Sequence, residues 1–208
     1  MRLVGVSAKA QSGKDTFADI ATTVYGNINR LAFAGCVKKE VAEFLEDCEV
    51  LFEHRHLWGD NSDKEAILRI SQRYKDYEPM PGYLLEHGSY NAGWWYFTPR
   101  TLMQYFGTEY RRAQDDQYWV KKCMNSCSKS MLNIITDVRF PNEVKAIKDA
   151  GGVVVRIDRP DRPGVSNQEH PSETALDGYL DWDYIIYNHG SLADYEQSVR
   201  DVLARIVT

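Results

Sequence analysis

The sequence of 208 residues predicts a three-layer α/β fold with about five parallel strands. Short apolar runs of strand length alternate along the chain with longer stretches whose apolar residues recur at helical spacing. The first of these runs is followed directly by a loop with glycine and lysine, and then by a helical stretch. The hydrophobic fraction of 43% is enough to fill the core of one such domain.

The first sixteen residues, MRLVGVSAKAQSGKDT, contain the most informative motif of the chain. Arg2 to Val6 is an apolar, β-branched run that predicts a buried strand, and a helix is expected over about 14–25. A strand, a loop with Gly13 and Lys14, and a helix follow one another in a P-loop, where backbone N–H groups and a lysine bind phosphate. The alternative is an ordinary helix N-terminus with a surface lysine.

This loop departs from the usual pattern G-x-x-x-x-G-K-S/T at two positions. Ala8 replaces the first glycine, which is tolerable unless the backbone there needs a positive φ. Asp15 stands where a hydroxyl residue normally ligates Mg²⁺, so either Thr16 serves instead or Asp15 holds the ion through water. Thr16 and Asp15 are therefore the candidate metal ligands.

Composition excludes several classes of function. A net charge of −5 without a long basic run argues against nucleic-acid binding by phosphate neutralisation. No stretch approaches the roughly 20 apolar residues that span a membrane, so no membrane partner is expected. Because the first strand begins beside Met1, we expect no signal peptide and a cytoplasmic protein. Cys36, Cys48, Cys123 and Cys127 lack zinc-ligand spacing, although the last two lie one helical turn apart, and reduced thiols are expected.

The next stretch predicts a short strand over 28–33 and a helix over 34–45. Lys38 and Lys39 lie in the first turn of that helix, where lysine is unfavourable to the helix and a pair of lysines attracts an anion. Ordinary solvated lysines are the alternative. Farther along, a capping sequence predicts a helix over about 61–74.

The stretch from Tyr83 to Phe97 is aromatic, contains glycine and has no clear period. We interpret it as an insertion or lid rather than as core scaffold. Trp58, Trp94 and Trp95 could stack on a nucleobase, although aromatic side chains more often contribute to packing.

Thr98 as N-cap and Pro99 at the first position predict the start of a helix. Leu102, Tyr105 and Phe106 are expected to face inward. The other side has polar residues at spacings of three and four, which suits a face approached closely by a ligand because a glycine is among them. A solvated surface stripe is the alternative. The polar residues are Arg100, Gln104, Gly107, Thr108 and Arg111.

A second helix is expected over about 117–127 and contains Trp119. The apolar run from Met131 to Ile135 then predicts a buried strand, with Asp137 just beyond its carboxyl end and Arg139 two residues later. In proteins with a P-loop, a carboxylate at this place organises Mg²⁺ or orients a substrate. A structural ion pair is the alternative for such a sequence.

The last third of the chain continues the alternation. A helix that begins near Glu143 is expected over about 141–150, followed by strands over 153–157 and 184–187. Ser191 predicts the cap of a final helix. The residues of that helix expected to face inward are Leu192, Tyr195, Val199, Val202, Leu203 and Ile206.

Between these two strands lies a polar, proline-rich stretch, Asp158 to Glu173, that contains Arg159 and further arginines. It fits a mobile lid that closes on ATP, with a disordered connector as the alternative.

Four segments together resemble the bacteriophage deoxynucleoside monophosphate kinases, a family of P-loop nucleoside monophosphate kinases. The resemblance covers most of the chain except about 50–95, and Asp15 matches what this family has after the lysine. The segments are Ser12 to Thr16, Leu31 to Lys38, Arg100 to Arg111, and Thr136 to Glu143.

The resemblance implies an enzyme that transfers the γ-phosphoryl group of ATP to a deoxynucleoside 5′-monophosphate, giving the diphosphate and ADP, with Mg²⁺. It also implies the cytoplasm of an infected bacterial host as location, and such kinases often form homodimers. In domain terms, the resemblance implies that residues 1–208 form one P-loop kinase domain. Its core spans 1–50 and 130–208, with a helical substrate-binding insertion at about 50–130 and a lid at about 158–175.

The resemblance also implies residue roles. Those expected to bind ATP are Ser12, Gly13, Lys14, Asp15, Thr16 and Arg159. Those expected to bind the monophosphate are Lys9, Lys38, Arg100, Gln104, Gly107, Thr108, Arg111, Trp119, Asp137, Arg139 and Glu143. Those expected to act in catalysis are Lys14, Asp15, Arg100, Asp137 and Arg139. Lys9 differs from the family in its place within the loop, and the part of the insertion that contacts the base does not align, which leaves base preference open.

Two alternatives to this function stay open. One is another small-molecule P-loop kinase, such as a phosphomevalonate or dephospho-coenzyme A kinase. The other is a non-catalytic, nucleotide-dependent switch protein, which would hydrolyse ATP slowly and without response to a deoxynucleoside monophosphate.

Overall fold

The computed structural model describes residues 2–78, 88–160 and 174–207. The chain divides into two compact units, which are described separately: unit 1 is Met1–Phe33 with Val120–Thr208, and unit 2 is Ala34–Trp119. Most of the expected lid, residues 161–173, lies outside the described residues. In the described part of the chain, no helix is both long enough and apolar enough to cross a membrane.

Unit 1 contains a five-stranded parallel sheet in the order β2-β6-β1-β7-β8, which confirms the expected number and direction of strands. The second strand ends at Leu31, earlier than expected, because Phe33 already begins the next helix. The strands are β1 (Arg2–Ala8), β2 (Ile28–Leu31), β6 (Leu132–Ile135), β7 (Val153–Asp158) and β8 (Tyr184–Tyr187).

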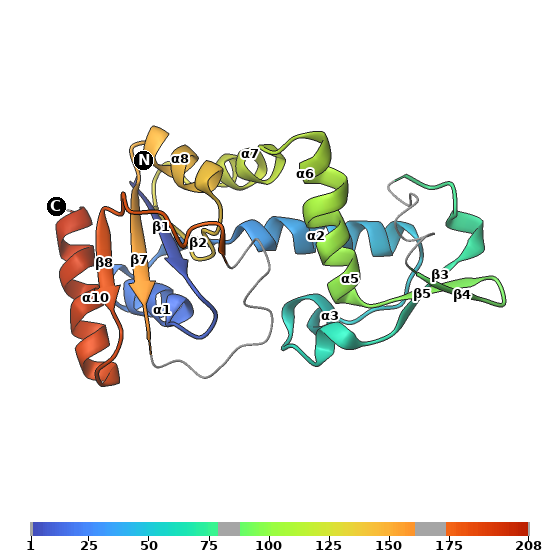
Figure 1. Ribbon diagram of the computed structural model, residues 1–208, viewed down its shortest axis with the longest axis horizontal. Helices are drawn as coiled ribbons and strands as arrows, with labels where there is room; N and C mark the ends of the chain where they lie inside the picture. The colour runs from blue at the N-terminus through green and yellow to red at the C-terminus, as the bar shows by residue number, and fades with distance from the viewer. Residues whose placement is uncertain (1, 79–87, 161–173, 208) are drawn as a thin grey trace. The chain divides into compact units, whose positions relative to one another are not determined.

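Helices cover both faces of this sheet, so unit 1 has three layers (Figure 1). Helices α1 (Lys14–Tyr25) and α10 (Leu192–Val207) contact each other on one face, and α8 (Pro141–Asp149) packs on β1 and β7 from the other. The expectation that Leu192 faces inward is wrong, because its side chain is 70% exposed. As the first residue of α10, Leu192 precedes the buried stripe, which starts at Tyr195.

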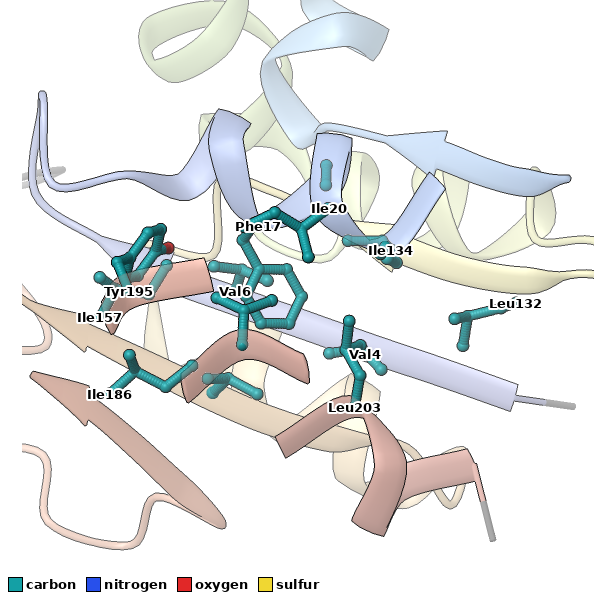
Figure 2. Packing of buried hydrophobic residues seen from close by; sticks show 14 residues of the cluster. Val4, Val6, Phe17, Ile20, Leu132, Ile134, Ile157, Ile186, Tyr195 and Leu203 are labelled. Carbon is teal, nitrogen blue, oxygen red and sulfur yellow. The ribbon is translucent and has the colours of Figure 1, made fainter. Parts of the chain in front are cut away.

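The core of unit 1 lies between β1 and the two helices α1 and α10 (Figure 2). Val4 and Val6 on β1 are fully buried, as is Phe17 on α1. Tyr195 and Leu203 complete the contact from α10. Full burial of an aliphatic or phenylalanine side chain stabilises a fold by about 1.5–3 kcal/mol. This cluster therefore packs strand β1 and helix α1 against helix α10.

Packing on the opposite face of β1 depends on a glycine, Gly5. Side chains alternate along a strand, so Gly5 faces α8 while Val4 and Val6 face α1. A Cβ atom on Gly5 would lie 2.5 Å from Cδ1 of Ile147 and 3.0 Å from Cγ2 of Val138. Helix α8 therefore approaches β1 closely because residue 5 has no side chain.

Asn133 is a fully buried polar residue within β6. Its Nδ2 donates to the carbonyl oxygens of Arg2 (3.0 Å) and Ser128 (2.8 Å). Its Oδ1 accepts from Nδ2 of Asn29 (2.8 Å) and from the backbone N–H of Ser128 (2.6 Å). These bonds tie β6 to β1, to β2 and to the preceding loop, a role that the sequence did not indicate.

Unit 2 combines helices with a three-stranded antiparallel sheet of order β3-β5-β4. Helix α2 (Phe33–Asp47) has its first residue in unit 1, and α7 (Tyr118–Asn125) ends in unit 1. The other elements are α3 (His54–Trp58), η1 (Asp63–Glu65), β3 (Leu68–Ser71), η2 (Gln72–Tyr74), β4 (Ser89–Asn91), β5 (Trp94–Phe97), α5 (Pro99–Gln104), the π-helical η3 (Tyr105–Tyr110) and α6 (Arg111–Gln114).

The helix expected over 61–74 is wrong, because this stretch contains β3 between two short 3₁₀ turns. Leu68 and Ile70 are buried while Arg69 between them is exposed, which is the alternation of a strand. The partner of β3 is β5, which lies in the aromatic stretch without a clear period. Local signals suggested a helix, but pairing with this distant strand decided the structure.

The second half of that aromatic stretch forms a β-hairpin of β4 and β5. Ala92 and Gly93 join the strands with φ of 48° and 85°, the backbone of a two-residue turn whose twist matches that of the strands. Residues 79–87 lie outside the described residues.

The helix start at residue 98 is confirmed. The Oγ1 of Thr98 accepts from the backbone N–H of Thr101 (3.1 Å), and Leu102, Tyr105 and Phe106 are buried as expected. After α5 the helix widens into the π-helical η3, which rotates later residues away from regular α-helical spacing. The polar stripe is therefore less regular than the spacing indicated.

Replacing Gly5 by alanine should lower the free energy of unfolding by about 2 kcal/mol, because the new methyl group collides with Ile147 in a packed layer. Urea denaturation measures this loss. The matched control is Gly178→Ala, since a Cβ atom there meets no atom within 4 Å, and it should change stability little.

Ile147→Val removes the Cδ1 atom with which the Gly5→Ala methyl collides. The double variant should therefore lose less stability than the sum of the two single variants. Additive losses would show that the collision does not cause the destabilisation.

Candidate functional site

The candidate residues fall into two groups, one in each unit. Unit 1 contains Lys9, Ser12, Gly13, Lys14, Asp15, Thr16, Asp137, Arg139, Glu143 and Arg159, and unit 2 contains Lys38, Arg100, Gln104, Gly107, Thr108, Arg111 and Trp119.

The loop between β1 and α1 has the geometry of an anion site. Gln11 and Gly13 have left-handed φ values of 62° and 108°, and the N–H of Ser12 donates back to the carbonyl oxygen of Lys9 (3.2 Å). Helix α1 begins directly after Gly13, so its unpaired N–H groups and the positive end of its dipole face the loop. Such a helix start binds phosphate or carboxylate groups readily.

Ala8, which replaces the first glycine of the usual motif, fits its position. It pairs with Ile157 at the end of β1. Positive φ at non-glycine residues occurs, within the described part of the chain, at Gln11, Glu49 and Ala92. Ala8 therefore has an ordinary backbone, and alanine is tolerated there.

A chain of ion pairs lies beside this loop. Nζ of Lys14 is 2.5 Å from Oδ2 of Asp15, and Oδ1 of Asp15 is 2.7 Å from Nη2 of Arg30. Partial burial alone would raise the pKa of Asp15, but the hydrogen bonds and positive charges of Lys14 and Arg30 outweigh it and hold that pKa below its usual value. The Asp15 side chain is 61% exposed, and pairs of this kind contribute about 0–1 kcal/mol. An anion can therefore displace Asp15 from Lys14 at low cost.

The candidate metal ligands supply oxygen donors only. The carboxylate of Asp15 and the hydroxyl of Thr16 are hard ligands of the kind that Mg²⁺ prefers. Among residues 2–78, 88–160 and 174–207, no three His, Cys, Asp or Glu side chains come together to hold a metal by themselves. This donor set fits an ion that takes most of its ligands from phosphate and water, and the metal site stays a prediction.

A cavity of about 270 Å³ lies beside the loop in unit 1. Nζ of Lys9 is 2.8 Å from Oδ1 of Asp177, and Nη1 of Arg159 donates to the carbonyl oxygen of Gln11 (3.1 Å). Lys9, which lies in the loop, thus pairs with a residue that lines the cavity, and Arg159 bonds to the backbone of the loop. The lining residues are Lys9, Ser12, Arg156, Ile157, Asp158, Arg159, Pro160 and Asp177.

Asp137 follows the carboxyl end of β6, as the sequence predicts. Its side chain is buried, and its Oδ1 accepts from the backbone N–H of Phe33 (2.7 Å). The neighbouring N–H groups of Thr136 and Val138 donate to the carbonyl oxygens of Leu31, the last residue of β2, and of Val6 within β1. Asp137 is therefore held rigidly at the carboxyl edge of the sheet.

Glu143 caps the start of α8. It is 1% exposed, and its Oε2 accepts from the N–H groups of Arg139 (2.7 Å) and Phe140 (3.1 Å). This bonding orients the backbone at Arg139. Contact of Asp137, Arg139 or Glu143 with a substrate stays a prediction.

In unit 2, Arg111 is held by a buried carboxylate. Its Nε donates to Oε1 of Glu40, whose Oε2 accepts from the hydroxyl of Tyr118 (2.7 Å). The guanidinium also lies 4.6 Å from the ring centroid of Tyr110 and 4.9 Å from that of Tyr118. Glu40 is only 7% exposed, so the ion pair is largely shielded from water.

Arg100 differs from Arg111 because its partner is exposed. Its Nε donates to Oε1 of Glu65, and both side chains are open to solvent. Gln104 and Thr108 are also exposed. Lys38 lies half-buried on α2. These side chains are accessible to a ligand.

Gly107 and Trp119 contact each other. Nε1 of Trp119 donates to the carbonyl oxygen of Gly107 (2.9 Å), and the indole ring is 1% exposed. A Cβ atom on Gly107 would lie 3.8 Å from Val37, an ordinary contact distance. Packing of the described residues therefore does not require glycine at position 107.

The sequence did not indicate the contacts that six residues make with the candidates, although Tyr195 was correctly expected to face inward. These residues are Arg30, Glu40, Glu65, Asp177, Asn188 and Tyr195. Asn188, His189 and Gly190 follow a strand and form a turn-like sequence that could have been noticed. The others had no local signal, because tertiary structure brings each of them to its partner.

Glu40→Gln should lower the free energy of unfolding by about 3 kcal/mol, because it leaves the Arg111 guanidinium without its charged partner in a shielded place. Urea denaturation measures this effect. Glu65→Gln makes the same change in the exposed pair with Arg100 and should cost less than about 1 kcal/mol. Equal losses in the two variants would contradict this difference between the pairs.

Comparison with known proteins identifies one protein family. The sequence model of the family described as "Deoxynucleotide monophosphate kinase" matches residues 89–199, more than half of the 208 residues. A protein of Acanthamoeba polyphaga mimivirus named "Putative deoxynucleotide monophosphate kinase" is 25% identical over 215 residues, covering 96% of this chain and 94% of its own. "Uncharacterized protein ORF77" of Ictalurid herpesvirus 1 (strain Auburn) is 34% identical over 110 residues, 50% of this chain and 47% of that protein.

Two solved structures are similar over the chain. A dephospho-CoA kinase from Campylobacter jejuni has a TM-score of 0.49 at 15% identity, covering 99% of this chain and 98% of its own. A Thermus thermophilus protein has a TM-score of 0.45 at 15% identity, covering 98% of this chain and 96% of its own.

Proposed function

The chain belongs to the deoxynucleotide monophosphate kinase family, and on this premise we propose how its residues perform the reaction. It is an ATP-dependent phosphotransferase that transfers the γ-phosphoryl group of ATP to a deoxynucleoside 5′-monophosphate, giving the diphosphate and ADP. The observation that supports the mechanism best is the loop between β1 and α1, with its left-handed Gly13 at the start of a helix.

ATP binds with its phosphates against this loop. The N–H groups at the start of α1 would donate to the phosphate oxygens, and the Lys14 ammonium would add a positive charge beside them. The exposed ion pair with Asp15 supports this role, since Lys14 can exchange that partner for a phosphate oxygen. The proposed ATP-binding residues are Ser12, Gly13, Lys14, Asp15, Thr16 and Arg159.

Each unit contains residues that we propose for binding of the deoxynucleoside monophosphate. Arg111 suits this task because Glu40 and two tyrosine rings hold its planar guanidinium, which can then donate to phosphate with little loss of entropy. Arg100 is exposed and can turn from Glu65 to the substrate. The proposed acceptor-binding residues are Lys9, Lys38, Arg100, Gln104, Gly107, Thr108, Arg111, Trp119, Asp137, Arg139 and Glu143.

The chemical step is an in-line displacement at the γ-phosphorus atom. An oxygen of the acceptor phosphate forms the new bond to phosphorus, while the bond to the bridging oxygen breaks and ADP leaves. That oxygen is already anionic, so no general base is required. Lys14, Arg100 and Arg139 neutralise the charge that spreads over the phosphoryl oxygens, and Asp137 orients the acceptor.

The donor chemistry of Thr16 and Asp15 supports Mg²⁺ as the metal, with either Thr16 as its ligand or Asp15 holding it through water. When bound with ATP, the ion would neutralise charge on the phosphate oxygens.

Three finer expectations belong to this proposal. A bacteriophage source is implied by the resemblance, while the two relatives described above come from a mimivirus and a herpesvirus. A location in the cytoplasm of an infected bacterial host goes with that source, and a homodimer goes with the family. All three stay predictions.

The decisive experiment measures ADP formation with a panel of deoxynucleoside monophosphates, ribonucleoside monophosphates, phosphomevalonate and dephospho-coenzyme A. At least one deoxynucleoside monophosphate should raise ADP formation far above the rate with ATP alone. Turnover with another phosphorylated metabolite only would favour a different small-molecule kinase. Slow ADP formation that no acceptor changes would favour a switch protein.

Lys14→Met should reduce kcat by about a hundred- to a thousandfold, because it removes one charge that stabilises the transferring group. Steady-state kinetics with the best acceptor of the panel measure this loss. Lys145→Met is the control, since Lys145 lies exposed on α8 and pairs only with Asp149 among the contacts described. Full turnover by Lys14→Met would refute the assignment of Lys14.

A further inference from the structure

Two side chains from the last part of the chain contact the backbone of the loop between β1 and α1. Nδ2 of Asn188, which follows β8, donates to the carbonyl oxygen of Ser12 (3.0 Å). The hydroxyl of Tyr195, on α10, donates to the carbonyl oxygen of Gly13 (2.8 Å). Neither residue belongs to the proposed ATP-binding set.

These two bonds help to hold the orientation of two peptide groups. The carbonyl oxygen of Gly13 also accepts from the backbone N–H of Phe17 (2.9 Å), so Tyr195 adds a second donor to it. A trans peptide is planar, so the carbonyl of one residue and the N–H of the next point in opposite directions. Fixing the carbonyls of Ser12 and Gly13 therefore turns the N–H groups of Gly13 and Lys14 away from Asn188 and Tyr195. These are the N–H groups that begin the proposed phosphate-binding stretch.

The peptide before Gly13 needs such a restraint. Glycine adopts positive and negative φ with similar ease, so the Ser12–Gly13 peptide can flip unless something holds it. Gly13 has a φ of 108°, which presents its N–H in one direction only. Asn188 holds the carbonyl whose flip would reverse that N–H.

We propose that Asn188 and Tyr195 are positioning residues that hold the N–H groups of Gly13 and Lys14 in the orientation that binds the phosphates of ATP. This inference rests on the proposed function, because it takes the loop as the ATP site. Neither side chain touches the substrate in this account, and both act through the backbone.

The surroundings of Tyr195 suit this task. Its ring is 2% exposed and belongs to the core cluster of unit 1 (Figure 2), so the hydroxyl has a fixed position. Burial raises the pKa of the Tyr195 hydroxyl further above neutral, so the group stays a protonated donor.

Close packing strengthens the restraint. A Cβ atom on Gly13 would lie 3.0 Å from Nδ2 of Asn188 and 3.1 Å from the hydroxyl of Tyr195. Both donors therefore reach the loop because residue 13 has no side chain.

Tyr195→Phe tests the proposal, because it removes the hydroxyl and keeps the buried ring. Loss of one neutral hydrogen bond should weaken binding of a non-hydrolysable ATP analogue about fivefold, measured by titration calorimetry. The KM for ATP should rise similarly, while the KM for the deoxynucleoside monophosphate stays unchanged. Asn188→Ala removes the other donor and should have the same selective effect.

Tyr25→Phe is the matched control. The hydroxyl of Tyr25, at the end of α1, donates to the carbonyl oxygen of Leu203 on α10 (3.0 Å), away from the loop. Both tyrosine variants lose a bond from a tyrosine hydroxyl to a backbone carbonyl, so their thermal stabilities should fall by similar amounts. Only Tyr195→Phe should weaken binding of the ATP analogue.

Wild-type affinity in both Tyr195→Phe and Asn188→Ala, or an equal loss in Tyr25→Phe, would overturn the positioning role. The failure of the proposed function looks different, since the wild-type protein would then phosphorylate no deoxynucleoside monophosphate. Binding of the ATP analogue can be compared among the variants in either case.

Discussion

The left-handed backbone at Gly13 is the constraint on which the candidate site of unit 1 depends. It lets the chain turn from β1 into α1, so that the start of the helix comes directly after the loop. Strand β1 is the central strand of the sheet, paired with β6 and β7, and the loop therefore starts from the most constrained strand of the unit. Because residue 13 has no side chain, Asn188 and Tyr195 can pack against the loop and bond to it.

The parallel sheet brings the other candidates of unit 1 to the same edge. Asp137 follows β6, Arg159 follows β7 and Asn188 follows β8, so residues distant in sequence share the carboxyl edge of the sheet. Their side chains differ in exposure. Asp137 is buried, and its carboxylate is held in place by the backbone N–H of Phe33. Lys14 and Asp15, in contrast, form an exposed ion pair that can exchange partners.

Unit 2 shows the same division between fixed and exchangeable charges. Arg111 is clamped by a buried carboxylate and two rings, and Arg100 is paired with exposed Glu65. A guanidinium that is already oriented binds phosphate with a smaller loss of entropy. A guanidinium with an exposed partner can instead change its conformation when a substrate binds. In the proposed reaction, Arg111 would hold the acceptor and Arg100 would neutralise charge that moves during the transfer.

The sequence by itself determined the parallel α/β class, the strand–loop–helix order around Gly13 and the helix start at Thr98, because periodicity, glycine and capping residues act over a few positions. It missed β3, whose pairing with β5 depends on a distant segment, and the widening of the helix into η3. Candidate residues could be named from motifs, but their partners could not: Arg30, Glu40, Asp177, Asn188 and Tyr195. Tertiary structure alone decided these contacts, because each joins residues whose local sequences contain no signal of the other.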